Sequence, residues 1–145
     1  KQAQMLPWLI GQGVPADAAE VFLRTSGGRP DDALVLFQSG HNPQTWAQLP
    51  QAMLRGDASA LADWSAAQAI EALQKLCHDL LLLRVGAAPR YFAAADLPAA
   101  PAIGPLTQWS LALSTAARTA ERPFNPGLML EALAAQARKA LHSRH

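Results

Sequence analysis

Residues 66–85 carry an apolar stripe at the spacing of an α-helix. Alanine and leucine recur along it at intervals of three or four residues, at Ala69, Leu73, Leu76, Leu80 and Leu83. Residues at these intervals lie on one face of a helix, and an apolar face of this width needs other helices to cover it. The segment therefore predicts a long helix inside a helical bundle.

The opposite side of this predicted helix is polar. Glu71, Lys75 and His78 share it, and Glu71 precedes Lys75 by four residues, which is the favourable order for an ion pair. Leu82 also lies on this side. A single exposed leucine is ordinary in a folded protein, and contact with a partner protein is the alternative interpretation of Leu82.

The rest of the chain also predicts helices, and it shows neither strand-like alternation nor an internal repeat. Three short helices are expected over about 4–12, 15–25 and 30–38, and a break follows them. Further helices are expected over about 44–55, 58–65 and 105–122. Asn125 and Pro126 then have the preferences of the cap and first turn of a last helix.

Residues 86–104 are rich in proline and alanine and predict an ordered crossing loop. We expect Arg90, Tyr91 and Phe92 to hold this loop against the core. The predicted fold class is therefore all-α. Its domains are a unit of three short helices over 1–41 and a helical bundle over 42–145.

The composition argues against several classes of protein. Half of the 145 residues are hydrophobic, 16% are charged, and the net charge is +1, which argues against an autonomous nucleic-acid-binding domain. No uncharged apolar run is long enough to span a bilayer. The single cysteine, Cys77, is consistent with a cytoplasmic protein. The chain starts at Lys1 without a signal-peptide pattern, and we expect it to start inside a longer protein.

No motif in the chain predicts catalytic chemistry. It contains neither a G-x-x-x-x-G-K-[ST] phosphate loop nor a G-x-S-x-G nucleophile turn, and its four histidines lack metal-ligand spacing. Cys77 and His78 are adjacent on the predicted helix, so their side chains point about 100° apart. We expect Cys77 in the core and His78 in solvent, with a metal or nucleophile role as the alternative. The sequence thus predicts no catalytic residue, no metal site and no cofactor.

Four tryptophans lie near apolar positions of the predicted helices. Packing between helices is the first interpretation of Trp46 and Trp109, and contact with a partner protein is the alternative. Together with Leu82, these two residues are the candidate partner contacts.

Residues 26–36 join a glycine pair, Gly27 and Gly28, to the start of an apolar helix. Such junctions often hold a phosphate, because a helix N-terminus offers free N–H groups and the positive end of the helix dipole. Here the first turn carries Asp31 and Asp32, which suit helix capping and would repel an anion. The segment thus has the geometry of a nucleotide site with the wrong charge.

This segment resembles the third helix of the lid domain in AAA+ clamp-loader subunits, whose ATP-hydrolysing members have a G-x-x-R-D-A-L pattern. Gly28 matches the glycine, Asp32 matches the acid, and residues 33–34 match the final A-L. Asp31 stands at the position of the arginine that reaches the nucleotide phosphates in active members. The resemblance therefore implies that this segment binds no nucleotide, since a carboxylate would repel a triphosphate.

Three later segments resemble the C-terminal domain of the delta-prime subunits of bacterial DNA polymerase III clamp loaders. They are residues 76–81, 86–92 and 125–131, and the whole resemblance covers about 14–141 through their order and spacing. It implies that residues up to about 40 end an AAA+ lid domain. Residues from about 42 onward would form a helical collar domain, and a phosphate-loop domain would lie upstream.

The resemblance also implies a function, which is non-catalytic assembly. The collar would hold the subunit in a five-membered ring that loads the sliding clamp during DNA replication. The expected partners are gamma/tau-type and delta-type subunits, with no membrane and no direct nucleic-acid contact. The alternative is a free-standing all-helical domain that senses a ligand or acts as an adaptor, which would need a pocket lined by convergent polar groups.

Overall fold

The computed structural model describes residues 2–38, 43–62, 64–118 and 125–143, and these residues form α-helices and 3-10 turns without a strand. The all-α fold class is therefore confirmed. In chain order the α-helices are α1 (Gln2–Gly11), α2 (Ala16–Thr25), α3 (Pro30–Gln38), α4 (Pro43–Arg55), α5 (Ala66–Arg84), α6 (Ile103–Ala117) and α7 (Pro126–Leu141). Two 3-10 turns, η1 (Ala58–Leu61) and η2 (Ala94–Asp96), lie between them.

The long helix predicted over 66–85 is confirmed as α5, and its whole predicted stripe is buried except for Leu83, which packs against the core from its edge. Its first turn is fixed by a capping box. The Ser65 hydroxyl accepts a hydrogen bond from the N–H of Gln68, and the Gln68 side chain accepts one from the N–H of Ser65.

The prediction of a helix over 58–65 is wrong, because the described residues of this stretch form only the 3-10 turn η1. The Asp57 carboxylate accepts hydrogen bonds from both the N–H and the hydroxyl of Ser59. Such local side-chain bonds compete with a regular helix. The helix predicted from Pro105 begins at Ile103 instead, while Asn125 caps α7 as expected by accepting from the N–H of Leu128. The break predicted over 39–43 lies outside the described residues except for Pro43, which begins α4, and the predicted helix end at 119–122 lies outside them too.

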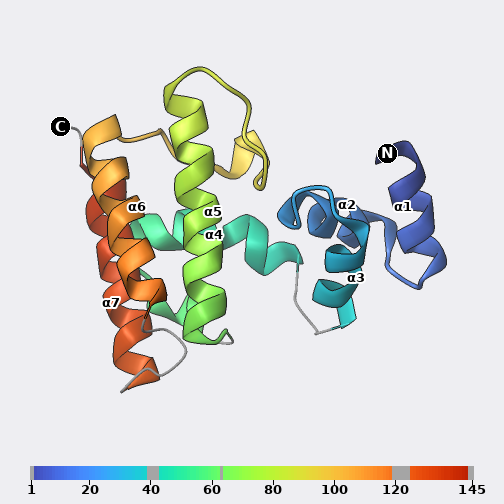
Figure 1. Cartoon of the computed structure of the whole chain (residues 1–145), viewed down its shortest axis with the longest axis horizontal. Helices are drawn as coiled ribbons and strands as arrows, with labels where there is room; N and C mark the ends of the chain where they lie inside the picture. Colours follow the sequence, from blue (N-terminus) through green and yellow to red (C-terminus); the bar gives the residue numbers. More distant parts are fainter. Residues whose placement is uncertain (1, 39–42, 63, 119–124, 144–145) are drawn as a thin grey trace.

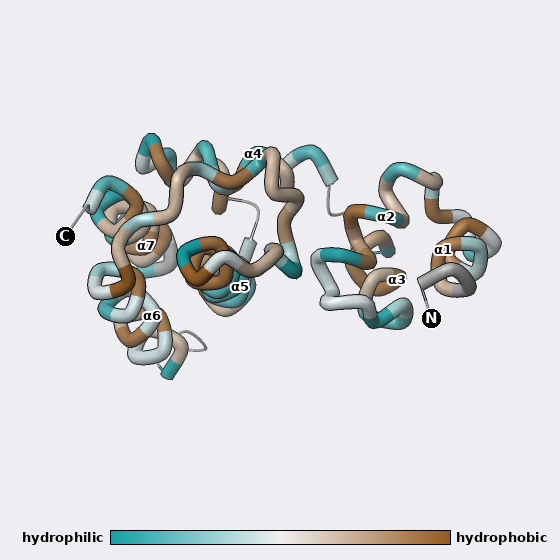
Figure 2. The backbone as a smooth tube through the Cα atoms, turned by 90° about the horizontal axis from the view of Figure 1, so that it is seen from above, coloured by the Kyte–Doolittle hydropathy of each residue, from teal (hydrophilic) through white to brown (hydrophobic). Residues whose placement is uncertain are grey.

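The buried apolar side chains form two separate clusters. The smaller one lies among α1, α2 and α3, and the larger one, which we call the bundle core, lies among α4, α5, α6 and α7. Figure 1 shows α5, α6 and α7 side by side with α4 running across them, and Figure 2 shows the three N-terminal helices as a separate group. Val21 of α2 packs against the bundle core, so the two groups are in contact. The division into domains at residue 41 remains a prediction.

Candidate functional site

The crossing loop after α5 is held by a buried carboxylate. Asp79 in α5 has no exposed surface, and its two oxygens accept hydrogen bonds of 2.8–2.9 Å from the backbone N–H groups of Arg90, Tyr91 and Phe92. A buried carboxylate needs such donors to replace its lost hydration. The loop is therefore tied to the C-terminal half of α5.

Aromatic packing holds the same loop from its other side. The rings of Trp46 and Phe92 are stacked with centroids 4.5 Å apart, and the Trp46 indole N–H donates to the carbonyl of Tyr91 at 3.1 Å. This hydrogen bond satisfies the polar end of a buried tryptophan. The expectation that residues 90–92 hold the loop against the core is thus confirmed.

Two cations of the bundle bind the end of α2. Lys75 Nζ donates to the carbonyl of Thr25 at 2.9 Å, and the Arg90 guanidinium donates to the carbonyl of Gly27 at 3.1 Å. The ammonium group of Lys75 also lies 5.2 Å from the centre of the Tyr91 ring. The last carbonyls of a helix lack partners within the helix and form its negative end, so they favour cations. We call this contact between the two helix groups the junction.

The junction changes the interpretation of one predicted residue. Lys75 was expected on the polar side of the helix, paired with Glu71. The structure confirms this pair at 3.5 Å, but only 16% of the Lys75 side chain is exposed, because it lies between Tyr91 and the end of α2. His78 is half exposed, and its Nδ1 lies 3.3 Å from the carboxylate of Asp79.

The glycine–aspartate segment turns tightly between α2 and α3. Gly27 and Gly28 have φ of +72° and +89°, a region that glycine adopts without steric cost. The buried hydroxyl of Ser26 lies 2.9 Å from the carbonyl oxygens of both Leu23 and Arg29. These bonds define the turn, and Gly28 also donates its N–H to the carbonyl of Leu23.

The two aspartates of this segment are both exposed. Arg29 pairs with Asp32 at 2.9 Å and donates to the carbonyl of Ser26. Asp31 lies beside them in the first turn of α3, where a carboxylate suits the helix dipole. A hollow of about 440 Å³ beside Gly27 and Gly28 contains both Glu20 and Arg24. The segment is thus a hydrogen-bonded turn, and the absence of a nucleotide site there stays a prediction.

Cys77 and His78 lie as the sequence predicts. Cys77 is buried in the bundle core with its thiol 3.4 Å from the carbonyl of Leu106, and burial raises the pKa of the Cys77 thiol to about 11. The thiolate is the reactive form, so this cysteine is a poor nucleophile at neutral pH. Among the described residues, no group of His, Cys, Asp and Glu side chains could hold a metal ion.

The candidate partner contacts lie in different environments. Trp46 and Trp109 are 9% and 3% exposed, so they pack in the bundle core and leave little side-chain surface for a partner. Burial therefore favours packing between helices for both residues. Leu82 is partly exposed on α5 and keeps that interpretation as a prediction.

The outer face of α6 carries no charge, a feature that was not predicted from the sequence. The helix contains no charged residue from Ile103 to Ala117, and its Ile103 and Leu111 side chains are 51% and 65% exposed. The hydroxyls of Thr107 and Thr115 donate to the carbonyls of Ile103 and Leu111, four residues earlier. The face is thus less polar than its threonines suggest, because their hydroxyls are already bonded to the backbone.

Comparisons of the chain with protein-family models, curated proteins and solved structures found no match. Among the helices in the described ranges, none is both long enough and apolar enough to cross a membrane.

Proposed function

We propose that this chain is a non-catalytic assembly domain of a bacterial DNA polymerase III clamp loader, the C-terminal region of a delta-prime subunit. Its helices α1 to α3 would belong to the AAA+ lid, and α4 to α7 would form the collar domain. In this role the chain holds its place in a cytoplasmic ring with gamma/tau-type and delta-type subunits. The ATP-driven work of loading the sliding clamp belongs to other parts of the complex.

The absence of charged residues from α6 is the observation that supports this proposal most strongly. A helix that runs for four turns on a surface without a charge suits burial against another helix, because protein interfaces are depleted of charged residues at their centre. Leu111, at 65% exposure, is the largest apolar side chain near the middle of this face. Burial of such a side chain would favour association by about 2 kcal/mol.

The junction also supports an assembly role. Lys75 binds the last carbonyl of α2 and Arg90 binds the carbonyl of Gly27 in the turn that follows, while the loop that carries Arg90 is fixed to Asp79. A ring subunit has to hold its lid at a set angle to its collar, and side chains bonded in this way resist rotation. Asp31 agrees with a subunit that does not use its lid helix to sense nucleotide, since its carboxylate stands at the arginine position.

The test is to mix the full chain with collar domains of gamma/tau-type and delta-type subunits and to analyse the mixture by size-exclusion chromatography. We expect a co-migrating complex, and Leu111→Glu should weaken it at least tenfold because the variant buries a charge. Ile10→Glu is the matched control, since Ile10 is 47% exposed and lies on α1, in the N-terminal group of helices. A chain that stays folded and ignores both subunit types would refute the proposal and favour the free-standing sensing or adaptor domain.

A further inference from the structure

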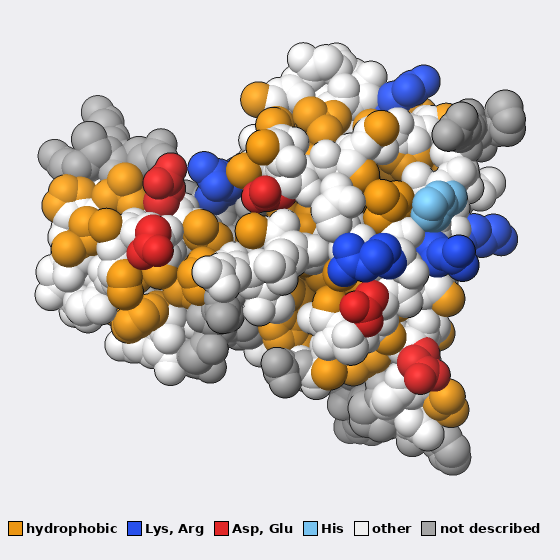
Figure 3. All heavy atoms as spheres, turned by 180° about the vertical axis from the view of Figure 1, so that it is seen from behind, with side chains coloured by type: hydrophobic (Ala, Val, Ile, Leu, Met, Phe, Trp, Pro, Cys, Tyr) orange, Lys and Arg blue, Asp and Glu red, His pale blue; other side chains and the backbone are white. Residues whose placement is uncertain are grey.

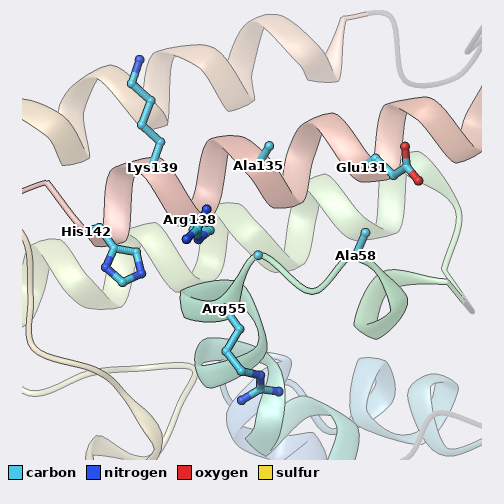
Figure 4. A pocket seen from close by; sticks show the side chains of 8 residues that line it. Arg55, Ala58, Glu131, Ala135, Arg138, Lys139 and His142 are labelled. Carbon is cyan, nitrogen blue, oxygen red and sulfur yellow. The ribbon is translucent and has the colours of Figure 1, made fainter.

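A basic groove lies between the end of α4 and the last three turns of α7. It has a volume of about 730 Å³, and it is lined by His142 and by the charged side chains of Arg55, Arg138, Lys139 and Glu131. Figure 3 shows this face, on which lysine and arginine side chains gather beside a histidine. In Figure 4, Arg138 lies between the two helices while Arg55 and Lys139 extend to opposite sides. The groove therefore has Arg138 at its middle, while Arg55 and Lys139 stand on its two rims with their charged ends turned outward.

None of the three cations forms an ion pair within 4 Å in the described part of the chain. Arg24, Arg29 and Lys75 each lie within 4 Å of a carboxylate, whereas no described carboxylate lies that close to Arg55, Arg138 or Lys139. The acid nearest to Arg55 in sequence is Asp57. Hydrogen bonds from Ser59 and, more weakly, the charge of Arg55 lower the pKa of Asp57, and this carboxylate binds the N–H and the hydroxyl of Ser59.

Cations in the last turn of a helix are ordinary, because they complement the helix dipole. This groove differs because two of its side chains are held in place by the backbone of another element. Gly56 has φ of +72°, and a Cβ at this position would lie 2.7 Å from Cδ of Arg138, so the missing side chain makes room for the arginine stem. His142 Nε2 lies 2.7 Å from the carbonyl oxygen of Leu54, to which it donates. The end of α4 thus positions both residues.

We propose that this groove binds the phosphate group of a small anionic ligand. The guanidinium of Arg138 supplies paired N–H donors that match phosphate oxygens, and the long side chains of Lys139 and Arg55 would turn inward from the two rims to add charge. Glu131 lines the opposite end of the groove, about two turns of α7 away. A nucleic-acid strand with phosphates at regular intervals would meet this carboxylate, so the groove suits a compact phosphate compound. This inference rests on the groove alone and not on the proposed assembly function.

The test uses pyrophosphate as the probe, titrated into the full chain in a calorimeter. Inorganic phosphate and ADP are separate arms that distinguish a free phosphate from a nucleotide, and a single-stranded oligonucleotide tests the competing ligand class. Arg138→Gln and Lys139→Gln should each weaken pyrophosphate binding about tenfold, because each removes one charged donor. Arg84→Gln, which removes an exposed cation of α5 outside the groove, is the matched control and should leave binding unchanged.

Glu131→Gln should tighten pyrophosphate binding, because it removes the negative charge from the groove. A variant that had merely lost structure would bind more weakly instead. The proposal is overturned if none of the three phosphate compounds binds. It is also overturned if Arg84→Gln weakens binding as much as Arg138→Gln, or if the oligonucleotide binds more tightly than pyrophosphate at physiological salt.

Discussion

The carboxylate of Asp79 and the backbone N–H of Phe92 form a hydrogen bond of 2.8 Å in the interior of the protein, across 13 positions of the sequence. The N–H groups of Arg90 and Tyr91 donate to the same carboxylate, so one fully buried acid holds three consecutive backbone groups of the crossing loop. Arg90, one of the cations of the junction, lies in this loop. The position of Arg90 at the junction therefore depends on a residue that touches only the bundle.

Asp79→Asn should destabilise the whole protein. An amide has one acceptor oxygen, so it cannot serve all three N–H donors, and its NH₂ group would face one of them. We expect the free energy of unfolding in urea to fall by about 2–4 kcal/mol. Asp31→Asn is the control, since the exposed Asp31 should change stability by about 0.5 kcal/mol or less. Equal effects of the two variants would contradict the anchoring role of Asp79.

The helices could be predicted from the sequence because their signals are local. The stripe from Ala69 to Leu83, the cap at Asn125 and the loop after Arg84 all depend on residues a few positions apart. The hydrogen bonds of Asp79 could not be predicted in this way. Asp79 lies three residues after Leu76 and four before Leu83, on the apolar stripe itself, and that position was the signal of its burial. Its hydrogen-bond donors lie in a loop that no periodic pattern describes.

The junction could not be predicted for a related reason. Lys75 has the sequence context of an ordinary ion pair with Glu71, and that pair does form. Its second contact, the carbonyl of Thr25, lies 50 positions away and exists only because α2 docks against the bundle. The basic groove was missed in the same way, since Arg55 and Arg138 come from different helices.

Lys75→Met should loosen α2 from the bundle. Methionine keeps the apolar stem of the side chain but cannot donate to the carbonyl of Thr25, so the end of α2 loses a charged partner. We expect amides of α2 to exchange hydrogen about tenfold faster, while the core amides of α5 keep their protection. Arg84→Met, at an exposed position of α5, should change neither set. Unchanged exchange in α2 of the Lys75 variant would contradict a stabilising role of the junction.

Gly27→Ala and Gly28→Ala form a matched pair. Both residues have positive φ, so alanine costs about 1 kcal/mol at either position. A Cβ on Gly27 would also lie 3.3 Å from both the guanidinium of Arg90 and the ring of Tyr91, whereas a Cβ on Gly28 would meet no atom within 4 Å. We therefore expect the greater loss of unfolding free energy for Gly27→Ala in urea titrations. If Gly28→Ala is equally or more damaging, the close packing of the turn against Arg90 is wrong.

The thiol of Cys77 should make stability depend on alkaline pH. Its pKa is raised from 9.0 to about 11 by burial, so between these values the unfolded chain loses a proton that the folded protein keeps. Stability from this group is complete below pH 9 and decreases as pH rises toward 11, by roughly 2–3 kcal/mol in total. Urea titrations across this range should show a steeper decline for the native chain than for Cys77→Ala, which carries the same lysine, tyrosine and arginine titrations. Parallel declines in the two proteins would mean that the thiol ionises as readily in the fold as in water.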